Sequence, residues 1–277
     1  MTVTTEPQPD QQPARWNDHV AVYEAVFEPL TDAFARRALD ALALAPGASL
    51  IDVGAGNGGC ALIAAKAGAD VLAIDASPAM VDRIRQRAGD AGPFAGHVRA
   101  EVMDGTALTL TDATFDAAIS VFGVILFPDP VGGLREIARV LKPGGRAAIV
   151  TWTQPERYEF AARLMSAIAS VRGTQQPPSL PAQLRFREET AFRDLFSRSG
   201  LAAERIDVVP ERWRLPSAHW LVENIAFAPG IAAMLGSLGA DRKAVLDAFT
   251  AGVERDQGAG EITLSTVAFL GIGRKAR

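Results

Sequence analysis

The sequence has few of the residues that build disulfide frameworks and metal sites. Its 277 residues include one cysteine, Cys60, and three histidines at wide spacing. One cysteine cannot form an internal disulfide, and this spacing does not match the ligand pattern of a zinc site. We therefore expect no metal, and we interpret Cys60 as a small buried thiol.

Long apolar runs and blocks of like charge are also missing. The longest apolar run, near residues 117–127, is far shorter than the roughly 20 residues of a membrane-spanning helix. The formal net charge of −4 is spread without like-charge blocks, so no nucleic-acid or membrane partner is expected. Residues 2–13 are polar and contain prolines, unlike a signal peptide. These absences predict a cytoplasmic protein with a small-molecule ligand.

A strand, a glycine-rich turn and the start of a helix follow one another around residue 54. Residues 48–53 are apolar, as in a buried strand, and residues 60–69 are rich in alanine and free of proline, as in a helix. The glycines between them satisfy two patterns, the GxGxG of S-adenosylmethionine binders and the GxGxxG of dinucleotide binders. These glycines are Gly54, Gly56, Gly58 and Gly59. By themselves they do not distinguish the two cofactors.

Acidic residues near these glycines favour the sulfonium cofactor. Asp75 ends a second apolar run, where a carboxylate can accept from both ribose hydroxyls of either cofactor. Asp52 lies just before the turn, where it would repel a pyrophosphate but could meet an ammonium group. Asp104 follows a third strand-like segment, residues 97–102, where a carboxylate can accept from an adenine amino group.

The following segments continue the alternation of strands and helices. Residues 115–122 form an extended apolar run, and a helix and a Pro-Gly turn then lead into a strand at residues 147–152. Residues 261–274 read as a final strand.

Together these motifs resemble the class I S-adenosylmethionine-dependent methyltransferases, in particular the small-molecule branch similar to the ubiquinone and menaquinone biosynthesis methyltransferases. The resemblance covers residues 46–153 well and the remainder loosely. It implies an α/β fold with a Rossmann-like, seven-stranded, mostly parallel sheet whose last strand is antiparallel. Helices would cover both faces, and the N-terminal helices and insertions would form a helical cap. The cofactor would be S-adenosyl-L-methionine and the product S-adenosyl-L-homocysteine.

Cofactor contacts are expected on the glycine loop and at the ends of the second, third and fourth strands. For Met80, ordinary packing within a helix is an equal alternative. The expected cofactor residues are Asp52, Gly54, Ala55, Gly56, Gly58, Asp75, Ala76, Met80, Met103, Asp104, Gly105, Ser120 and Val121.

The acceptor is expected to be small and apolar or aromatic, because the end of the fourth strand offers apolar residues and no base. O-methylation is favoured over N- or C-methylation, and a general base would then help. The candidate bases, in order, are His19, Tyr23 and His219. Residues 16, 19 and 23 share one face of a predicted helix, which lines the pocket or packs on the sheet. Expected acceptor contacts are Trp16, Phe122, Phe127, Trp213 and Trp220.

The expected organisation places the cofactor core between lid and cap segments. Two alternatives stay open: an NAD(P)-dependent oxidoreductase that uses the same loop, and a non-catalytic S-adenosylmethionine-binding module. Whether two copies pair as a homodimer is also open. The predicted segments are a disordered tip (1–13), N-terminal lid helices (14–45), the cofactor-binding core (46–153), an insertion (154–187), a core helix and strand (188–209), a helical cap insertion (210–260) and the last core strand (261–277).

Overall fold

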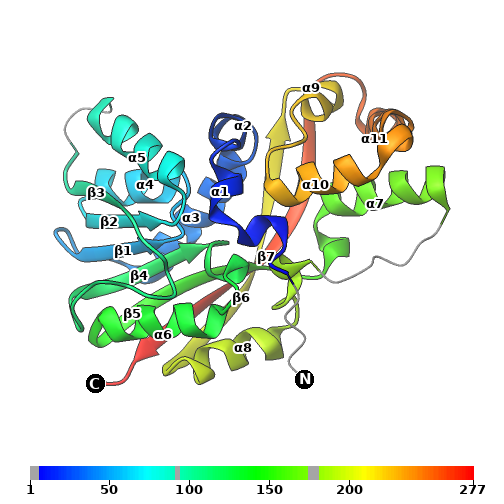
Figure 1. The fold of residues 1–277 in the computed structure, drawn as a ribbon. Coiled ribbons are helices and arrows are strands. Elements are labelled where there is room, and N and C mark those ends of the chain that lie inside the picture. The colour runs from blue at the N-terminus through cyan, green and yellow to red at the C-terminus, as the bar shows by residue number, and fades with distance from the viewer. Residues whose placement is uncertain (1–5, 91–93, 174–180) are drawn as a thin grey trace.

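A seven-stranded sheet forms the centre of the protein, which a computed structural model describes over residues 6–90, 94–173 and 181–277 (Figure 1). The strand order is β3-β2-β1-β4-β5-β7-β6, and β7 runs antiparallel to β5 and β6, opposite in direction to the other six strands. The predicted fold class is therefore confirmed. The strands are β1 (Ser49–Val53), β2 (Asp70–Asp75), β3 (His97–Val102), β4 (Phe115–Val121), β5 (Leu141–Trp152), β6 (Leu201–Leu215) and β7 (Ile262–Lys275).

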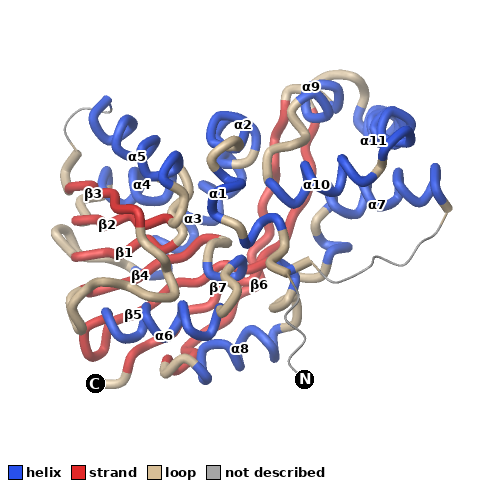
Figure 2. Tube along the Cα trace, in the orientation of Figure 1, coloured by secondary structure: helices blue, strands red, loops and turns tan. Residues whose placement is uncertain are grey.

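Helices cover both faces of this sheet (Figure 2). One face packs against α3 (Glu28–Leu42), α4 (Gly59–Lys66) and α5 (Pro78–Asp90), and the other against α6 (Pro130–Val140) and α8 (Glu189–Arg198). The alternation of side chains in β1 explains both contacts, because successive residues of a strand point to opposite faces. Leu50 belongs to the first apolar core, and Ile51 and Val53 belong to the second.

The cap lies beside the far ends of β6 and β7 (Figure 1). Its centre is aromatic: Phe160 lies against Trp213, Phe227 and Phe249, with ring centroids 5.5–5.9 Å apart. Between cap and core stand the short helices α1 (Pro13–Trp16) and α2 (Val20–Val26). The cap helices are α7 (Glu159–Arg172), α9 (Ala218–Glu223), α10 (Pro229–Ser237) and α11 (Arg242–Gln257).

The sixth strand is longer than the sequence predicts. Sequence patterns end it before Pro210, whereas β6 continues through this proline to Leu215. β6 is an edge strand, where alternate N–H groups need no ladder partner and a proline is tolerated. The cap insertion therefore begins after Leu215 and not at residue 210.

The prediction of a disordered tip is wrong for residues 9–13. Pro9–Gln11 form a 3₁₀ turn, and α1 begins at Pro13; residues 1–5 lie outside the described residues. Tertiary contacts order this polar segment: the Asp10 carboxylate accepts from Gly230 N at 2.6 Å, and the Trp16 indole donates to Asp10 O at 3.0 Å. Composition alone does not reveal such contacts.

Within the described ranges, no helix has the length and apolar character needed to cross a membrane.

Candidate active site

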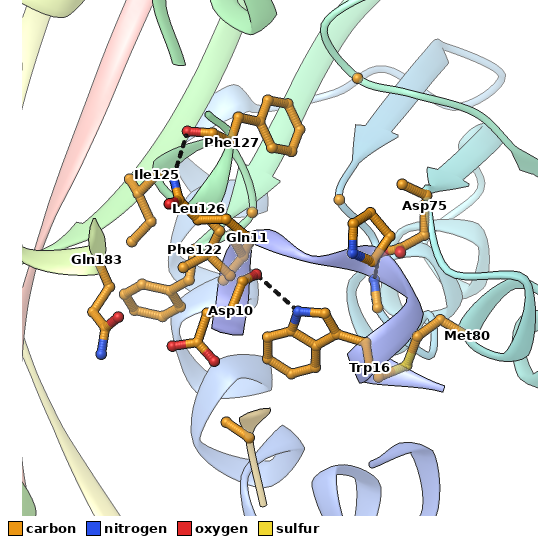
Figure 3. A pocket seen from close by; sticks show the side chains of 18 of the residues that line it. Asp10, Gln11, Trp16, Asp75, Met80, Phe122, Ile125, Leu126, Phe127 and Gln183 are labelled. Carbon is orange, nitrogen blue, oxygen red and sulfur yellow. Dashed lines mark hydrogen bonds between the residues drawn. The ribbon is translucent and has the colours of Figure 1, made fainter. Parts of the chain in front are cut away.

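A cavity of about 630 Å³ opens at the carboxyl ends of the parallel strands. The glycine loop and the strand ends line one side, and aromatic side chains from α1, α2, β5 and the cap line the other. In the view of Figure 3, Asp75 and Met80 lie on one side, Phe122 and Gln183 lie on the other, and Trp16 lies between them. The cavity is therefore one continuous space with two differently built halves.

Two backbone segments meet closely at the glycine loop. A Cβ on Gly54 would lie 2.9 Å from Gly123 Cα, and Gly54 itself has a φ of +72°. Only glycine adopts this conformation without strain and leaves room for the facing chain. The loop between β1 and α4 thus passes directly under the end of β4.

Asp75 fixes the loop from the neighbouring strand. Its Oδ2 accepts from Gly56 N at 2.9 Å, and its Oδ1 accepts from Ser77 N at 2.8 Å. Burial raises the pKa of Asp75 to about 6, although these N–H donors oppose the shift. The Ala76 N–H also donates to this carboxylate, so at least one lone pair remains for a ligand hydroxyl in the cavity that Asp75 lines.

Asp52 does not line this cavity. It is 1% exposed and borders a separate cavity of about 30 Å³ beneath the glycine loop. Burial raises its pKa to about 7, while the Cys60 thiol and Ala61 N–H donate to the carboxylate and partly offset that shift. Instead of the expected contact with an ammonium group, the structure places Asp52 under the loop, against the start of α4.

Most of the other expected cofactor residues line the cavity. Oδ1 of Asp104 accepts from Thr106 N and from the Thr106 hydroxyl, both at 2.8 Å, which holds this carboxylate at the rim. Ser120 lies outside: its buried hydroxyl donates to Val53 O at 2.6 Å and joins two strands. Ala55 and Gly58 also lie outside. Those that line it are Gly54, Gly56, Asp75, Ala76, Met80, Met103, Asp104, Gly105 and Val121.

Three stacked rings form the wall of the other half. Phe122 stacks on Trp152 with centroids 3.9 Å apart, and Trp152 stacks on Tyr158 at 4.8 Å. Phe122 has a φ of +59°, a strained conformation for a bulky residue that is characteristic of functional sites. Its position at the end of β4 brings this wall next to the glycine loop.

Trp152 and Tyr158 are two cavity residues that the sequence patterns did not predict. Both of the chain's tyrosines, Tyr23 and Tyr158, line the cavity. The Tyr158 hydroxyl is buried and has no hydrogen-bond partner among the described residues. The sequence offered one signal for Tyr158: the chain has only two tyrosines, and both lie in segments that line the cavity.

Of the three candidate bases, only Tyr23 reaches the cavity. Its ring lies edge-on to Trp16, with centroids 5.8 Å apart. Burial raises the pKa of Tyr23, while a hydrogen bond with the Thr31 side chain acts in the opposite direction. A phenol held in this way is a weak base at neutral pH.

The two histidines lie outside the cavity lining. Nδ1 of His19 is 2.9 Å from Ala226 O, which links α2 to the cap. The His219 side chain is 71% exposed and lies 3.3 Å from Glu254, because α9 buries Ala218 and Leu221 and directs His219 to the outside. Neither histidine is placed to act as a base in the cavity.

Of the five expected acceptor contacts, three line the cavity and two do not. Trp16, Phe122 and Phe127 line the cavity, the last with its ring against Gly105. Trp213 is instead a core residue, 1% exposed, whose indole donates to Val26 O at 2.9 Å. Trp220 is half-buried and also lies outside the cavity lining.

Across the described residues, no group of three or more His, Cys, Asp and Glu side chains is placed to hold a metal ion.

Known proteins resemble this chain in sequence and in fold. A family model described as a methyltransferase domain matches residues 51–149. An uncharacterized protein of Mycobacterium tuberculosis is 31% identical over 195 residues, which cover 68% of each chain. A demethylmenaquinone methyltransferase of Renibacterium salmoninarum is 32% identical over 171 residues, which cover 59% of this chain and 69% of that protein. This chain belongs to the class I S-adenosylmethionine-dependent methyltransferases.

The methyltransferase fold extends over most of the chain. The crystal structure of YcgJ from Bacillus subtilis matches with a TM-score of 0.56 at 20% identity, over 88% of this chain and 98% of that one. The methyl donor of this methyltransferase is S-adenosylmethionine, as predicted. The NAD(P)-dependent oxidoreductase and the non-catalytic module, which the sequence left open, are set aside.

The residues present fit this cofactor. The backbones of Gly54 and Gly56, both with positive φ, line the cavity, and the Asp75 carboxylate beside them can accept from a ribose hydroxyl. We propose that the nine cavity-lining residues given above are the cofactor contacts. S-adenosylmethionine supplies a methyl group already activated by its sulfonium centre.

Proposed function

We propose that this methyltransferase methylates an oxygen of a small, largely apolar or aromatic molecule. The observation that carries the proposal is the stacked wall of Phe122, Trp152 and Tyr158, which borders the same cavity as the glycine loop. Phe27 and Phe227 extend this apolar lining. Flat aromatic surfaces favour apolar and ring-shaped ligands over strongly charged ones.

The Tyr158 hydroxyl supports an oxygen-bearing acceptor. A buried hydroxyl that lacks a partner costs free energy, and the Tyr158 hydroxyl, which is closed off from the cavity in this structure, would turn toward an acceptor oxygen to remove that cost. It would also fix the acceptor's orientation. Holding the nucleophile in line with the activated methyl group and excluding water is the main task that remains for the protein.

The state of Tyr23 favours an acidic hydroxyl. This tyrosine forms a hydrogen bond with the Thr31 side chain, and its raised pKa keeps the phenol protonated at neutral pH, so that no phenolate is present to accept a proton. A phenol or enol can lose its proton to water near neutral pH more readily than an alcohol can. The phenolate oxygen then forms the bond to the methyl carbon, while the bond from that carbon to sulfur breaks and S-adenosylhomocysteine leaves.

A panel of acceptors built on one ring system tests this proposal. The enzyme is incubated with S-adenosylmethionine and 2-naphthol, 2-naphthylamine or 2-(hydroxymethyl)naphthalene, and the methylated products are measured by mass spectrometry. We expect 2-naphthol to react fastest. The variant Ile231→Trp, which fills the acceptor half from the cap, should lose this turnover but still bind S-adenosylhomocysteine. Methylation of the amine alone, or turnover unaffected by Ile231→Trp, would contradict the proposal.

A further inference from the structure

Asn57 lies at the centre of the glycine loop and is held from outside the cavity. It is 1% exposed. Its backbone oxygen accepts from Nη1 of Arg87 at 2.8 Å, and its side-chain Nδ2 donates to Oε2 of Glu24 at 3.3 Å. Neither Arg87 nor Glu24 lines the cavity. Hydrogen bonds from α2 and α5 therefore hold the loop on the side that faces away from the cavity.

Two bidentate ion pairs hold the side chains of Arg87 and Glu24 in place. Arg87 donates to both carboxylate oxygens of Glu28, at 2.7 and 2.8 Å, and Arg83 donates to both of Glu24, at 2.7 Å each. The Glu28 side chain is 8% exposed and that of Arg87 is 20% exposed. Paired planar contacts of this kind fix the direction of both groups. In this way α5 is tied to α2 and to α3.

The loop needs such support because it is rich in glycine. Gly56 and Gly58, on either side of Asn57, have φ values of +56° and +88°. Glycine gives access to these conformations, but it also gives an unsupported loop many others, and a ligand must then offset the entropy of ordering it. Asp75 fixes Gly56 from the cavity side, and Arg87 and Glu24 fix Asn57 from the opposite side.

We propose that Arg87 and Glu24 are positioning residues for the cofactor, which act through Asn57 to hold the glycine loop in its binding conformation. Glu24 also lies next to Tyr23 on α2. The helix that borders the acceptor half of the cavity is thereby joined to the cofactor loop. The residues proposed to contact the cofactor do not include Arg87, Glu24 or Asn57, so this role is additional to theirs.

Calorimetric titration with S-adenosylhomocysteine tests the proposal without any acceptor. Arg87→Met removes the hydrogen bond from Arg87 to the Asn57 carbonyl, and Asn57→Ala removes the hydrogen bond from the Asn57 side chain to Glu24. We expect each to weaken binding by about tenfold or more, which corresponds to about 1.4 kcal/mol. Arg87→Lys, which keeps one donor, should recover part of the affinity. Amide hydrogen exchange at residues 56–58 should become faster in both weakened variants.

Arg85→Met is the matched control. Arg85 lies on the same helix and donates to Ala100 O at 2.9 and 3.1 Å, but it has no hydrogen bond to the glycine loop. It should lose stability but keep its affinity for S-adenosylhomocysteine. If Arg87→Met does not fold, because Glu28 is left buried and unpaired, Asn57→Ala and Glu24→Ala, which removes the acceptor for Asn57 Nδ2, decide the matter. Binding within twofold of the unmodified protein in the folded variants would overturn the proposal, whatever the acceptor proves to be.

Discussion

The Cα of Gly123 lies 2.9 Å from the position that a Cβ on Gly54 would occupy. The two glycines join the ends of β1 and β4 in direct backbone contact, at the boundary between the two halves of the cavity. A side chain at Gly54 would therefore separate the strand ends and displace the loop that borders them.

The substitution Gly54→Ala should weaken both binding and folding. We expect at least a tenfold loss of affinity for S-adenosylhomocysteine, measured by calorimetry, and a loss of about 1–3 kcal/mol in the free energy of unfolding, measured with urea. Gly252→Ala is the control, because this glycine lies within α11 and a Cβ there meets nothing within 4 Å. That variant should gain about 0.5–1 kcal/mol. Unchanged binding in Gly54→Ala would show that the contact is dispensable.

Cofactor affinity should fall at acidic pH. Burial raises the pKa of Asp75 to about 6. Protonation removes the negative charge of the carboxylate and turns one oxygen into a donor, which weakens hydrogen bonds from ribose hydroxyls. Affinity for S-adenosylhomocysteine should be constant above pH 7 and fall about tenfold by pH 5, since one pH unit below the pKa leaves about one carboxylate in eleven ionised. Asp75→Asn should bind weakly at every pH. An affinity that stays level down to pH 5 would exclude Asp75 as the titrating group.

Replacing Asp52 should stabilise the protein, and more so at alkaline pH. The folded protein raises the pKa of this buried carboxyl to about 7, so the folded state favours the protonated form. The contribution of Asp52 to the free energy of unfolding is therefore most favourable below the pKa that Asp52 has in the unfolded chain. It is lost as pH rises through the pKa that Asp52 has in the folded protein. The gain from Asp52→Asn should therefore be larger at pH 8 than at pH 5, by on the order of 2 kcal/mol. Urea unfolding at the two pH values measures this difference, and an equal gain at both would contradict it.

Loss of the Tyr158 hydroxyl should weaken acceptor binding without lowering the stability of the protein. In Tyr158→Phe the buried hydroxyl without a partner disappears while the stack on Trp152 remains, so thermal stability should stay level or rise. The KM for a reactive phenol should increase about tenfold, and the affinity for S-adenosylhomocysteine should not change. A destabilised variant with full turnover would assign the hydroxyl a structural role instead.

The cofactor half of the molecule could be predicted because its signals are local. Residues 97–102 form β3 as expected, and the glycine turn after residues 48–53 has the predicted strand and helix on either side. Apolar periodicity and glycine spacing determine such elements within a short window. Most expected cofactor residues lie at strand ends for the same reason.

The acceptor half depends on contacts between distant segments, which periodicity does not reveal. Trp213 and Trp220 were expected there, yet Trp152 and Tyr158 line the cavity instead. Asp10 and Gln11 also line it, although the tip looked too polar to be ordered. Whether each of these residues lines the cavity depends on which segments of the cap pack against it.

The long hairpin of β6 and β7 places both ends of the cap insertion at one point. Leu215 and Ile262 are paired opposite each other, so residues 216–261 leave the sheet and return to it at adjacent positions. A two-residue Asn-Gly turn could close the strands there. The insertion can therefore change in length or sequence without a shift in the register of the strands that carry it.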